Sequence, residues 1–308
     1  MASIMTNVSA MTALQSLTAT NKKLDITQSR ISTGYRVNSA EDNAAYWSIA
    51  TTMRSDNGAL STVMDALGLG AATIDVAYTG MNSAIEAAKE IKNKLVAARQ
   101  PGVDRGKIQS EIEELQLQLK SIGDTSVFSG ENWISVDSGS ADYNPIKTIV
   151  ASFSRSNSGI TIGTISIDVG SVKLYDANDQ SGIIDTEDTT SNGGVTYSVA
   201  SLDISTLTNS DADLEDLEQM IAWVDTAISN MTTSAANLGA IKQRVSLQRD
   251  FVKTLMDAIT RGVSSLVDAD MNEESTKLQA LQVQQQLGVQ SLSIANQSSQ
   301  SILSLFRQ

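Results

Sequence analysis

Cysteine and histidine are both missing from this chain of 308 residues. Their absence removes the thiolate nucleophile, the disulfide, the imidazole base and the usual ligands of transition metals. A zinc protease site of the H-E-x-x-H type is impossible, and acidic pairs such as Asp211 with Asp213 are explained more simply as solvated helix faces. We therefore expect a protein that is not an enzyme and that binds no metal or cofactor.

Aromatic residues and proline are also scarce, at 4% of the chain and two residues respectively. The core must therefore be built from Ala, Leu, Ile, Val and Met, a composition that favours helices. Positive charge is in short supply too, because the formal net charge is -13. Binding to nucleic acid needs clustered Lys and Arg to neutralise phosphates, so a nucleic-acid partner is not expected.

Long apolar runs and a basic N-terminal segment are missing as well. No window reaches the roughly 18 apolar residues that a spanning helix requires, and the N-terminus lacks the basic and apolar regions of a secretion signal. The ends of the chain also lack the Lys and Arg face of helices that lie on membranes. The sequence predicts a soluble protein without a cleaved signal and without membrane insertion.

What the chain does have is a repeat of apolar residues at alternating spacings of four and three, the seam of a coiled coil. The first seam consists of Leu60, Met64, Leu67, Ala71, Ile74, Tyr78, Met81, Ile85, Ala88, Ile91 and Leu95. The pattern stops at residues 99–106, where a proline and two glycines favour a turn, and resumes over residues 108–122. It returns over residues 214–259. We predict long helices packed side by side as a rod, with an ordinary globular bundle as the alternative.

Residues 141–204 differ in composition, being rich in Ser, Thr, Gly, Asp and β-branched residues. Two stretches, "ITIGTISIDV" and "GVTYSVASLDI", show the period of two that is typical of strands, and segments such as "SRSNSG" are turn signals. We predict a small β-rich domain inserted between two parts of the rod, residues 41–140 and 205–270. A disordered insert is the alternative.

The two ends carry almost no charge. Residues 1–21 have no charged side chain and residues 278–308 have only Arg307, yet both have the pattern of amphipathic helices. Amides and hydroxyls suit a helix that is surrounded by protein, because they avoid the desolvation cost of charge. We predict that these two ends are disordered in the monomer and helical in an assembly. They belong to an N-terminal core helix with a spoke, residues 1–40, and a C-terminal core helix, residues 271–308. The alternative is that the ends pair with each other in the monomer.

A polar corner at residues 30–50 follows the first of these helices. Gly34 suits the left-handed conformation that ends a helix, and Ser39 followed by Asp42 is a helix-start signal. We interpret the corner as a spoke between two helical layers, and a solvated loop with a capping box is the alternative. The side chains available for contacts between neighbours are Arg30, Arg36, Glu41 and Asp42.

The corner sequence "RISTGYRVNSAEDNAAYWSIATTM" also resembles the signature of bacterial flagellins, R-[IL]-S-[ST]-G-x-[RK]-[IV]-N-S-A-x-D-[ND]-A-A-x-x-x-I-A. "LGAIKQRV" (238–245) and "ESTKLQALQVQQQLGVQSLSIANQSSQSILSLF" (274–306) are similar to the C-terminal helices of that family, and "FSGENW" (128–133) to its F-x-G turn. The resemblance covers residues 1–140 and 205–308 and is specific in combination. The sequence of the corner, together with the short insert, looks most like that of rhizobial, alphaproteobacterial flagellins.

This resemblance implies a structural subunit that polymerises with itself into the flagellar filament, the propeller for swimming. The terminal helices would form an inner core, the heptad segments an outer tube and the insert the exposed surface. The residues carried over as core packing are Leu14, Leu17, Leu24, Ile31, Leu278, Leu281, Leu292, Ile302 and Phe306. Those of the spoke are Arg30, Gly34, Arg36, Asn38, Glu41 and Asp42.

The resemblance also implies partners and a location. The partners are copies of the same chain and related flagellins, an export chaperone on the C-terminal segment, and the hook-associated and cap proteins. Export of the unfolded chain through the flagellar type III apparatus would place it outside the cell without a cleaved signal. The rival within the same resemblance is a hook-filament junction protein, which shares the flagellin ends.

One segment departs from the family pattern. Many flagellins carry an R-E-L-A-V segment that Toll-like receptors of vertebrates recognise, whereas this chain has "KEIKNKLVAARQ" (89–100), with Lys92 for the Arg and Lys94 for the Leu. Replacing a buried apolar anchor with an ammonium should cost several kcal/mol at a desolvated hot spot. We therefore expect weak or absent activation of that receptor.

Overall fold

A computed structural model of the protein describes residues 6–156 and 159–305, with side-chain environments as far as residue 297. The chain divides into two compact units. One consists of Met1–Gly58 with Met256–Gln308, and the other of Ala59–Leu255. We call the first the terminal unit and the second the central unit.

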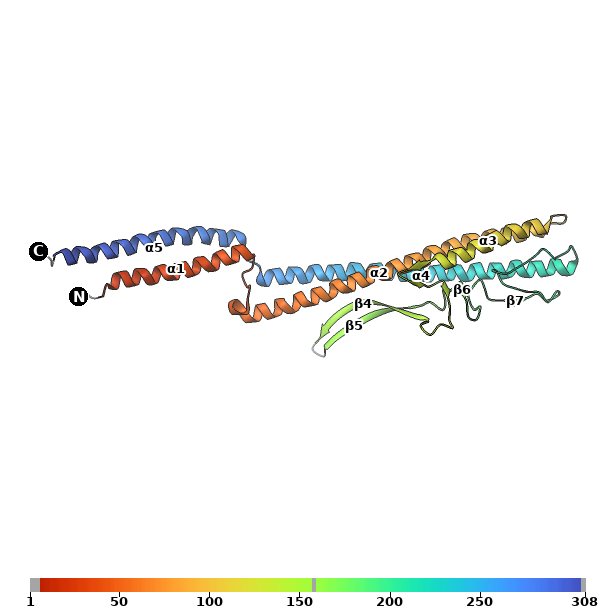
Figure 1. The fold of residues 1–308 in the computed structure, drawn as a ribbon, viewed down its shortest axis with the longest axis horizontal. Helices are drawn as coiled ribbons and strands as arrows, with labels where there is room; N and C mark the ends of the chain where they lie inside the picture. Colours follow the sequence, from red (N-terminus) through yellow and green to blue (C-terminus); the bar gives the residue numbers. More distant parts are fainter. Residues whose placement is uncertain (1–5, 157–158, 306–308) are drawn as a thin grey trace. The chain divides into compact units, whose positions relative to one another are not determined.

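The elements are mostly long helices (Figure 1). The helices are α1 (Val8–Thr33), α2 (Ala40–Ala98), α3 (Arg105–Thr125), α4 (Asp211–Val267) and α5 (Met271–Leu305). The strands are β1 (Val127–Phe128), β2 (Glu131–Asn132), β3 (Ser135–Val136), β4 (Ile146–Ser156), β5 (Gly159–Asp168), β6 (Tyr175–Asp176), β7 (Asp188–Thr189) and β8 (Thr196–Tyr197). The predicted fold class, mainly helical with a small strand-containing insert, is confirmed.

The central unit contains the predicted seams. Helices α2 and α4 run antiparallel, because Lys92 pairs with Asp225 and Lys242 pairs with Asp75, each at 2.6 Å. The fully buried seam residues of α2 are Leu67, Ile74, Met81, Ala88, Ile91 and Leu95, and those of α4 include Leu217, Val224, Met231, Leu238 and Val245. The spacing in the sequence therefore predicted which side chains form this core.

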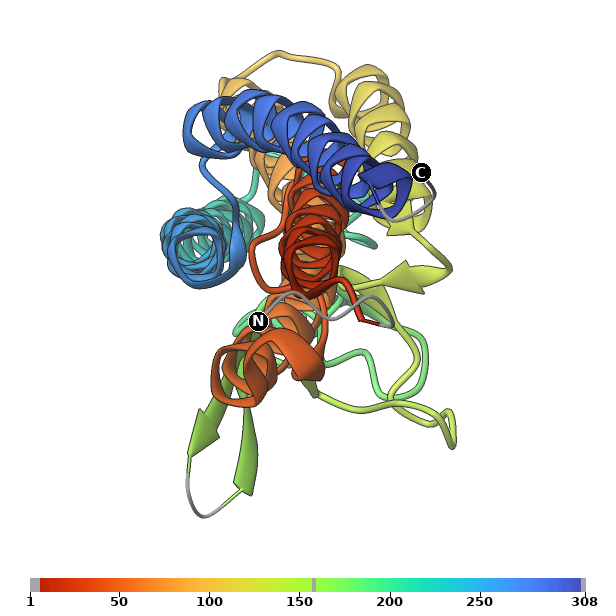
Figure 2. The ribbon, with the colours of Figure 1, turned by 90° about the vertical axis from the view of Figure 1, so that its left-hand side faces the viewer.

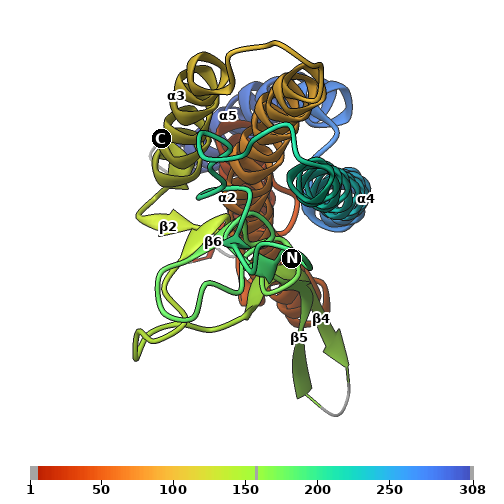
Figure 3. The same ribbon diagram turned by 90° about the vertical axis from the view of Figure 1, so that its right-hand side faces the viewer.

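Helix α3 turns back beside α2 after the predicted break. Gly102 has a φ of 86°, and Asp104 is the N-cap of α3, with its side chain accepting a hydrogen bond from the Lys107 N–H at 3.3 Å. Viewed along the helices, α2, α3 and α4 lie beside one another, and the strands lie on one side of them (Figure 3). The insert is therefore attached to one face of the central unit.

Each strand pairs with one other strand in the described residues. The longest pair is β4 with β5, which is antiparallel and has a bulge between Val150 and Ser152. Along β5 the predicted alternation holds near the helices, where Ile165 and Ile167 are buried. The shorter pairs are β1 with β2, β3 with β6 (parallel) and β7 with β8.

The stretch "GVTYSVASLDI" is a strand only at Thr196–Tyr197, so the prediction of an extended strand here was largely wrong. Its backbone is bound by glutamine side chains of α3 instead of a neighbouring strand. Gln116 Nε2 donates to the carbonyl oxygens of Val199 and Leu202, both at 3.1 Å. Tyr197, Val199, Leu202 and Ile204 are buried, but Ser198 is buried as well and Val195 is 39% exposed, so burial does not follow the period of two. Side-chain amides replace most of the ladder.

Helix α2 contains a window of 18 residues with a mean hydropathy of 1.3, which by length and composition alone would suffice to cross a membrane. This differs from the expectation that no such window exists, because alanines together with the seam residues raise the mean although polar residues and glycines interrupt the apolar run. The core helix of a soluble protein passes the same test. Only 28% of that window is buried in the structure, so the helix has a buried seam and an exposed side there rather than burial on all sides.

Candidate assembly interface

Helices α1 and α5 of the terminal unit pack against each other as an antiparallel pair (Figure 2). The side-chain amide of Asn7 donates to the Ala295 carbonyl oxygen at 3.0 Å. Further along, the amide of Gln285 donates to Asn21 Oδ1 at 2.9 Å. The structure thus has the paired arrangement that the sequence left open as an alternative.

The seam of this pair is narrow and contains small and polar residues. On α5 the buried and half-buried positions recur at spacings of four and three: Glu274, Leu278, Leu281, Gln285, Gly288, Leu292 and Ala295. Gly288 allows a close approach, because a Cβ atom there would lie only 3.1 Å from Leu17 Cδ1. A seam of this kind buries little apolar area for its length.

A second set of apolar side chains points away from the seam. On α1 they are Val8, Met11 and Leu14, and on α5 they are Val283, Leu287 and Ile294. Their exposed fractions range from 53% for Leu14 to 69% for Val8. In the sequence the α5 members are visible as apolar residues four and seven apart, but sequence reasoning grouped only the seam residues. Large apolar side chains exposed along both helices of a pair are candidates for burial against another protein chain.

The residues predicted as core packing divide between these two surfaces. Leu24 is buried in the seam, and Leu17, Ile31, Leu278, Leu281 and Leu292 are half-buried. Leu14 lies outside the seam and is 53% exposed. The side chains of Ile302 and Phe306 lie outside the described residues.

Gly34 ends α1 in the conformation expected from the sequence. Its φ is 75°, in the left-handed region, and its N–H donates to the Arg30 carbonyl oxygen at 2.8 Å. Its own carbonyl accepts from the Ala269 N–H at 2.9 Å, so the link between α1 and α2 is hydrogen-bonded to the link between α4 and α5.

Arg36 binds the end of α4. Its backbone N–H donates to the Val267 carbonyl oxygen at 2.7 Å, and its Nη2 donates to the Leu266 carbonyl oxygen at 2.9 Å. These carbonyls belong to the last turn of the helix, which has no intrahelical donors for them and favours positive charge. The neighbouring Val37 is buried with Val263 in a small apolar cluster. Sequence reasoning placed Arg36 in the corner but could not identify these partners.

The helix-start signal works in two steps. Asp42 Oδ2 accepts from the N–H groups of Ser39 and Asn38 at 3.1 and 3.0 Å, and these hydrogen bonds lower the pKa of Asp42. Asn43 then interrupts the helix, with φ -162° and ψ 102°, and its side chain caps the N–H groups that follow. Regular helix therefore starts after Asn43. Glu41 is exposed beside this turn.

Arg30 forms an ion pair inside the terminal unit. Its Nη1 lies 3.1 Å from Oε1 of Glu274, whose side chain is only 4% exposed. Burial alone would raise the pKa of Glu274, but hydrogen bonds from Arg30 and Lys277 outweigh it and hold that pKa below its usual value. The sequence predicted contacts between neighbours for Arg30, and it gave no signal for this partner 244 residues away.

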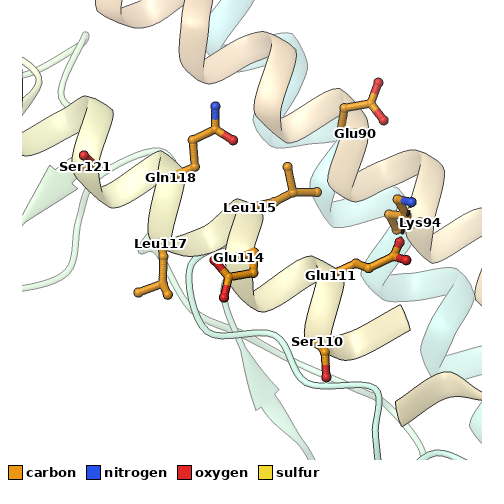
Figure 4. A pocket seen from close by; sticks show the side chains of 9 residues that line it. All are labelled: Glu90, Lys94, Ser110, Glu111, Glu114, Leu115, Leu117, Gln118 and Ser121. Carbon is orange, nitrogen blue, oxygen red and sulfur yellow. Dashed lines mark ion pairs between the residues drawn. The ribbon is translucent and has the colours of Figure 1, made fainter. Parts of the chain in front are cut away.

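In the central unit, a groove of about 760 Å³ lies between α2 and α3 (Figure 4). Its lining includes three carboxylates and one ammonium, which are Glu90, Glu111, Glu114 and Lys94. Lys94 forms an ion pair with Glu111, and Lys92 pairs with Asp225 of α4. Both lysines that distinguish this chain from the R-E-L-A-V pattern are thus bound within the chain.

Comparison with protein families identifies these helices. The bacterial flagellin N-terminal helical region matches residues 4–138, and the bacterial flagellin C-terminal helical region matches residues 221–306. The chain belongs to the bacterial flagellin family. This flagellin is a structural protein and not an enzyme, it is the subunit of the flagellar filament, and its place is outside the cell.

Relatives of this flagellin match over their full length. It is 50% identical over 323 residues to Flagellin C of Rhizobium meliloti (strain 1021) and 45% identical over 308 residues to a flagellin of Brucella melitensis. In both cases the alignment covers 100% of both chains. The resemblance to rhizobial flagellins is confirmed. Among solved structures, the crystal structure of Bacillus cereus flagellin aligns with a TM-score of 0.40 and 16% identity, over 62% of this chain and 88% of that one.

Proposed function

We propose that the α1/α5 pair is the part of this flagellin that holds the filament together, and that neighbouring subunits cover its exposed apolar side chains. The observation that carries the proposal is the second apolar set on a segment almost free of charge: Val8, Met11, Leu14, Val283, Leu287 and Ile294. Exposing these apolar side chains to water costs free energy in an isolated chain. Copies of the same chain supply the cover in a polymer.

The same proposal assigns each region of the chain to a layer of the filament. Residues 1–40 and 271–308 form the inner core with the spoke, 41–140 and 205–270 form the rod, and 141–204 form the outer surface. The support is that the uncharged surface with exposed apolar side chains belongs to the terminal helices, whereas the stretch rich in Ser and Thr belongs to the insert.

Assembly would also order the α1/α5 pair. Its seam includes Gln285, Gly288 and Glu274, so the two helices gain little from pairing with each other, and isolated helices are marginal in water. We expect rapid amide hydrogen exchange in α1 and α5 of the monomer and slow exchange in the filament. Equal protection of both helices in the two states would overturn this part of the proposal.

The direct test uses Leu287→Gln/Ile294→Gln, which changes two exposed side chains and leaves the seam intact. Purified protein is added to short filament seeds, and growth is followed by electron microscopy. We expect elongation to fall by at least about tenfold, because two apolar contacts of about 1 to 2 kcal/mol are lost at each subunit. The matched control is Ile160→Gln/Ile162→Gln, which alters equally exposed residues of β5. Unaltered growth of the α5 variant would contradict the proposal.

The apolar side of α5 is also the surface that we propose for an export chaperone before assembly, since an unassembled chain needs it covered. The cap and hook-associated proteins would meet the same α1/α5 pairs at the ends of the filament. The α5 variant should bind a flagellar export chaperone less tightly than the β5 control in a pull-down. Equal binding would assign the chaperone to another segment.

We further propose that vertebrate Toll-like receptors respond weakly to this flagellin. Lys92 and Lys94 stand where the recognised pattern has Arg and Leu, and their ion pairs with Asp225 and Glu111 would have to break to admit an apolar contact. A reporter-cell assay that compares the chain with Lys94→Leu should show a gain of signal for the variant. Full potency of the unaltered chain would contradict the proposal.

A further inference from the structure

Asparagine followed by glycine is a chemically labile pair, because the glycine nitrogen can attack the asparagine side chain without hindrance from a Cβ atom. The chain contains this pair twice, at Asn57–Gly58 and at Asn192–Gly193. The first lies inside α2, and the second lies in the turn between β7 and β8. The two pairs share one chemistry and differ in the structure around them.

The turn of residues 190–195 is docked on α4 by its backbone N–H groups. Asp216 Oδ2 accepts from the Gly193 N–H at 2.8 Å, and Asp216 Oδ1 accepts from the Asn192 N–H at 3.2 Å. The side-chain amide of Asn192 donates to Glu215 Oε2 at 2.9 Å. A Cβ atom on Gly193 would lie only 2.8 Å from Asp216 Oδ2. The missing side chain therefore permits this docking and also leaves the pair chemically reactive.

We propose that Asn192 is a modification site, which loses its side-chain amide without an enzyme at a rate set by docking of the turn on α4. The Gly193 nitrogen loses its proton to hydroxide and attacks Asn192 Cγ. As the new N–C bond forms, the Cγ–Nδ2 bond breaks, and the amide nitrogen leaves as ammonia with a proton from water, which regenerates the hydroxide. Water then opens the cyclic imide to aspartate or isoaspartate.

The docked turn opposes this reaction. The proton on the Gly193 nitrogen is shared with Asp216 Oδ2, and its removal would leave two negative charges 2.8 Å apart. The hydrogen bond to Glu215 holds the Asn192 side chain on α4. The reaction therefore follows opening of the turn. Residues 191–194 are all exposed, and segments with few buried contacts open at a low cost in free energy.

Asn57 is protected by a much larger structure. It lies well inside the 59-residue helix α2, and its side-chain amide donates to Thr260 Oγ1 at 3.1 Å. Opening the chain there means breaking backbone hydrogen bonds of a long helix, which costs more free energy than opening a surface turn. Asn192 should therefore react first in the folded protein.

The product cannot dock in the same way. A carboxylate at position 192 replaces the donor that faces Glu215 with a further negative charge, and isoaspartate also lengthens the backbone. Asp216, which is 1% exposed, then loses its N–H partners, and an unpaired buried charge is costly. The loss of ammonia is irreversible, so each modified copy keeps a detached turn. This inference does not depend on the proposed role of the α1/α5 pair.

The test follows the modification in the full chain. The protein is incubated at mildly alkaline pH, folded or unfolded in urea, and peptide mass spectrometry measures aspartate and isoaspartate formed at Asn57 and Asn192. In the folded protein we expect Asn192 to react at least about tenfold faster than Asn57, and in urea we expect similar rates at both. Absence of reaction at Asn192 in the folded protein overturns the proposal, and so does a rate no higher than that of Asn57.

Two variants test control by docking. Asp216→Ala releases the Gly193 N–H and should raise the rate at Asn192 several-fold. Glu215→Ala changes an exposed residue and keeps the buried carboxylate, so its smaller increase cannot come from misfolding. The matched control Glu187→Ala, at an exposed carboxylate of the insert, should react like the wild type. Unaltered rates at Asn192 in both docking variants would overturn control by docking.

Asn192→Asp mimics one product and tests its consequence. We expect faster amide hydrogen exchange at residues 190–195 in this variant than in the wild type, because the turn no longer docks on α4. Equal exchange would overturn the claim that the modified turn detaches.

Discussion

The seam of the central unit and the seam of the α1/α5 pair share the same spacing of three and four but contain different residues. The α2 seam is made of aliphatic side chains such as Leu67 and Ile74, which are completely buried. The α5 seam includes Gln285 and Gly288, and its leucines remain partly exposed. Periodicity therefore determines which face of a helix packs, whereas the residues on that face determine whether the helix needs a neighbouring subunit.

The largest effect is expected from the central seam. Leu67→Ala removes a fully buried side chain and should lower the free energy of unfolding by about 3 kcal/mol. Leu69→Ala, two residues further and 55% exposed, should change it by less than about 0.5 kcal/mol. Urea denaturation of the monomer followed by circular dichroism measures both. Similar losses for the two variants would mean that the central unit also depends on its neighbours, and the comparison would fail.

The second-largest effect is expected from removing a buried charge, Arg105, in the central unit. Arg105 is 7% exposed, and its guanidinium donates to the carbonyl oxygens of Ala98 and Leu207 and to the side chain of Asn209. Arg105→Met would leave these acceptors unpaired, so we expect a loss of about 2 to 3 kcal/mol in the same denaturation experiment. Lys107→Met, on the exposed side of α3, is the control and should be close to neutral.

A smaller effect should appear in the terminal unit as the pH is lowered. The pKa of Glu274 is below its usual value in the folded state, so its contribution to stability is present above the usual pKa and is lost as the pH falls through the lowered one. In filaments, amide protection of α1 and α5 should therefore decrease several-fold below about pH 4.5, the ordinary Glu value.

Glu274→Gln separates this group from the other carboxylates. The variant keeps the size of the side chain but cannot titrate, so its protection should depend less on pH over the same range. Hydrogen exchange by mass spectrometry on both filaments provides the measurement. A pH dependence that is the same in the variant would assign the loss to other carboxylates.

These expectations depend on contacts that the sequence predicted to different degrees. The seams of α2 and α4, the break at residues 99–106 and the left-handed Gly34 follow from spacing, proline and glycine, which act over a few residues. Two partners of Arg105, the backbone carbonyls of Leu207 and Thr208, lie about a hundred residues away, and no local pattern indicates them. The same holds for Arg30 with Glu274, where sequence reasoning found the charged residue but not its partner.

In the insert, too, the sequence predicted some contacts and not others. "ITIGTISIDV" correctly predicted β5, because its cross-strand partner β4 directly precedes it in the chain and the two form a hairpin. In "GVTYSVASLDI" only Thr196–Tyr197 pairs with a strand, and a glutamine side chain of α3 binds the backbone carbonyls of Val199 and Leu202 instead. Alternation by itself therefore does not establish a strand, and a nearby partner strand is needed for a ladder.

The smallest effect is expected from the ion pairs across α2 and α4. Lys92 Nζ lies 2.6 Å from Asp225 Oδ1, but the two side chains are 36% and 60% exposed, so water screens their attraction. Asp225→Asn should lower the free energy of unfolding by about 0.5 kcal/mol or less, and about 1 M salt should remove the difference. If this variant were as damaging as Leu67→Ala, surface charge and not aliphatic burial would hold the central unit. The lower stability expected for the α1/α5 pair would then be explained by its scarcity of charge, and not by the glycine and amides in its seam.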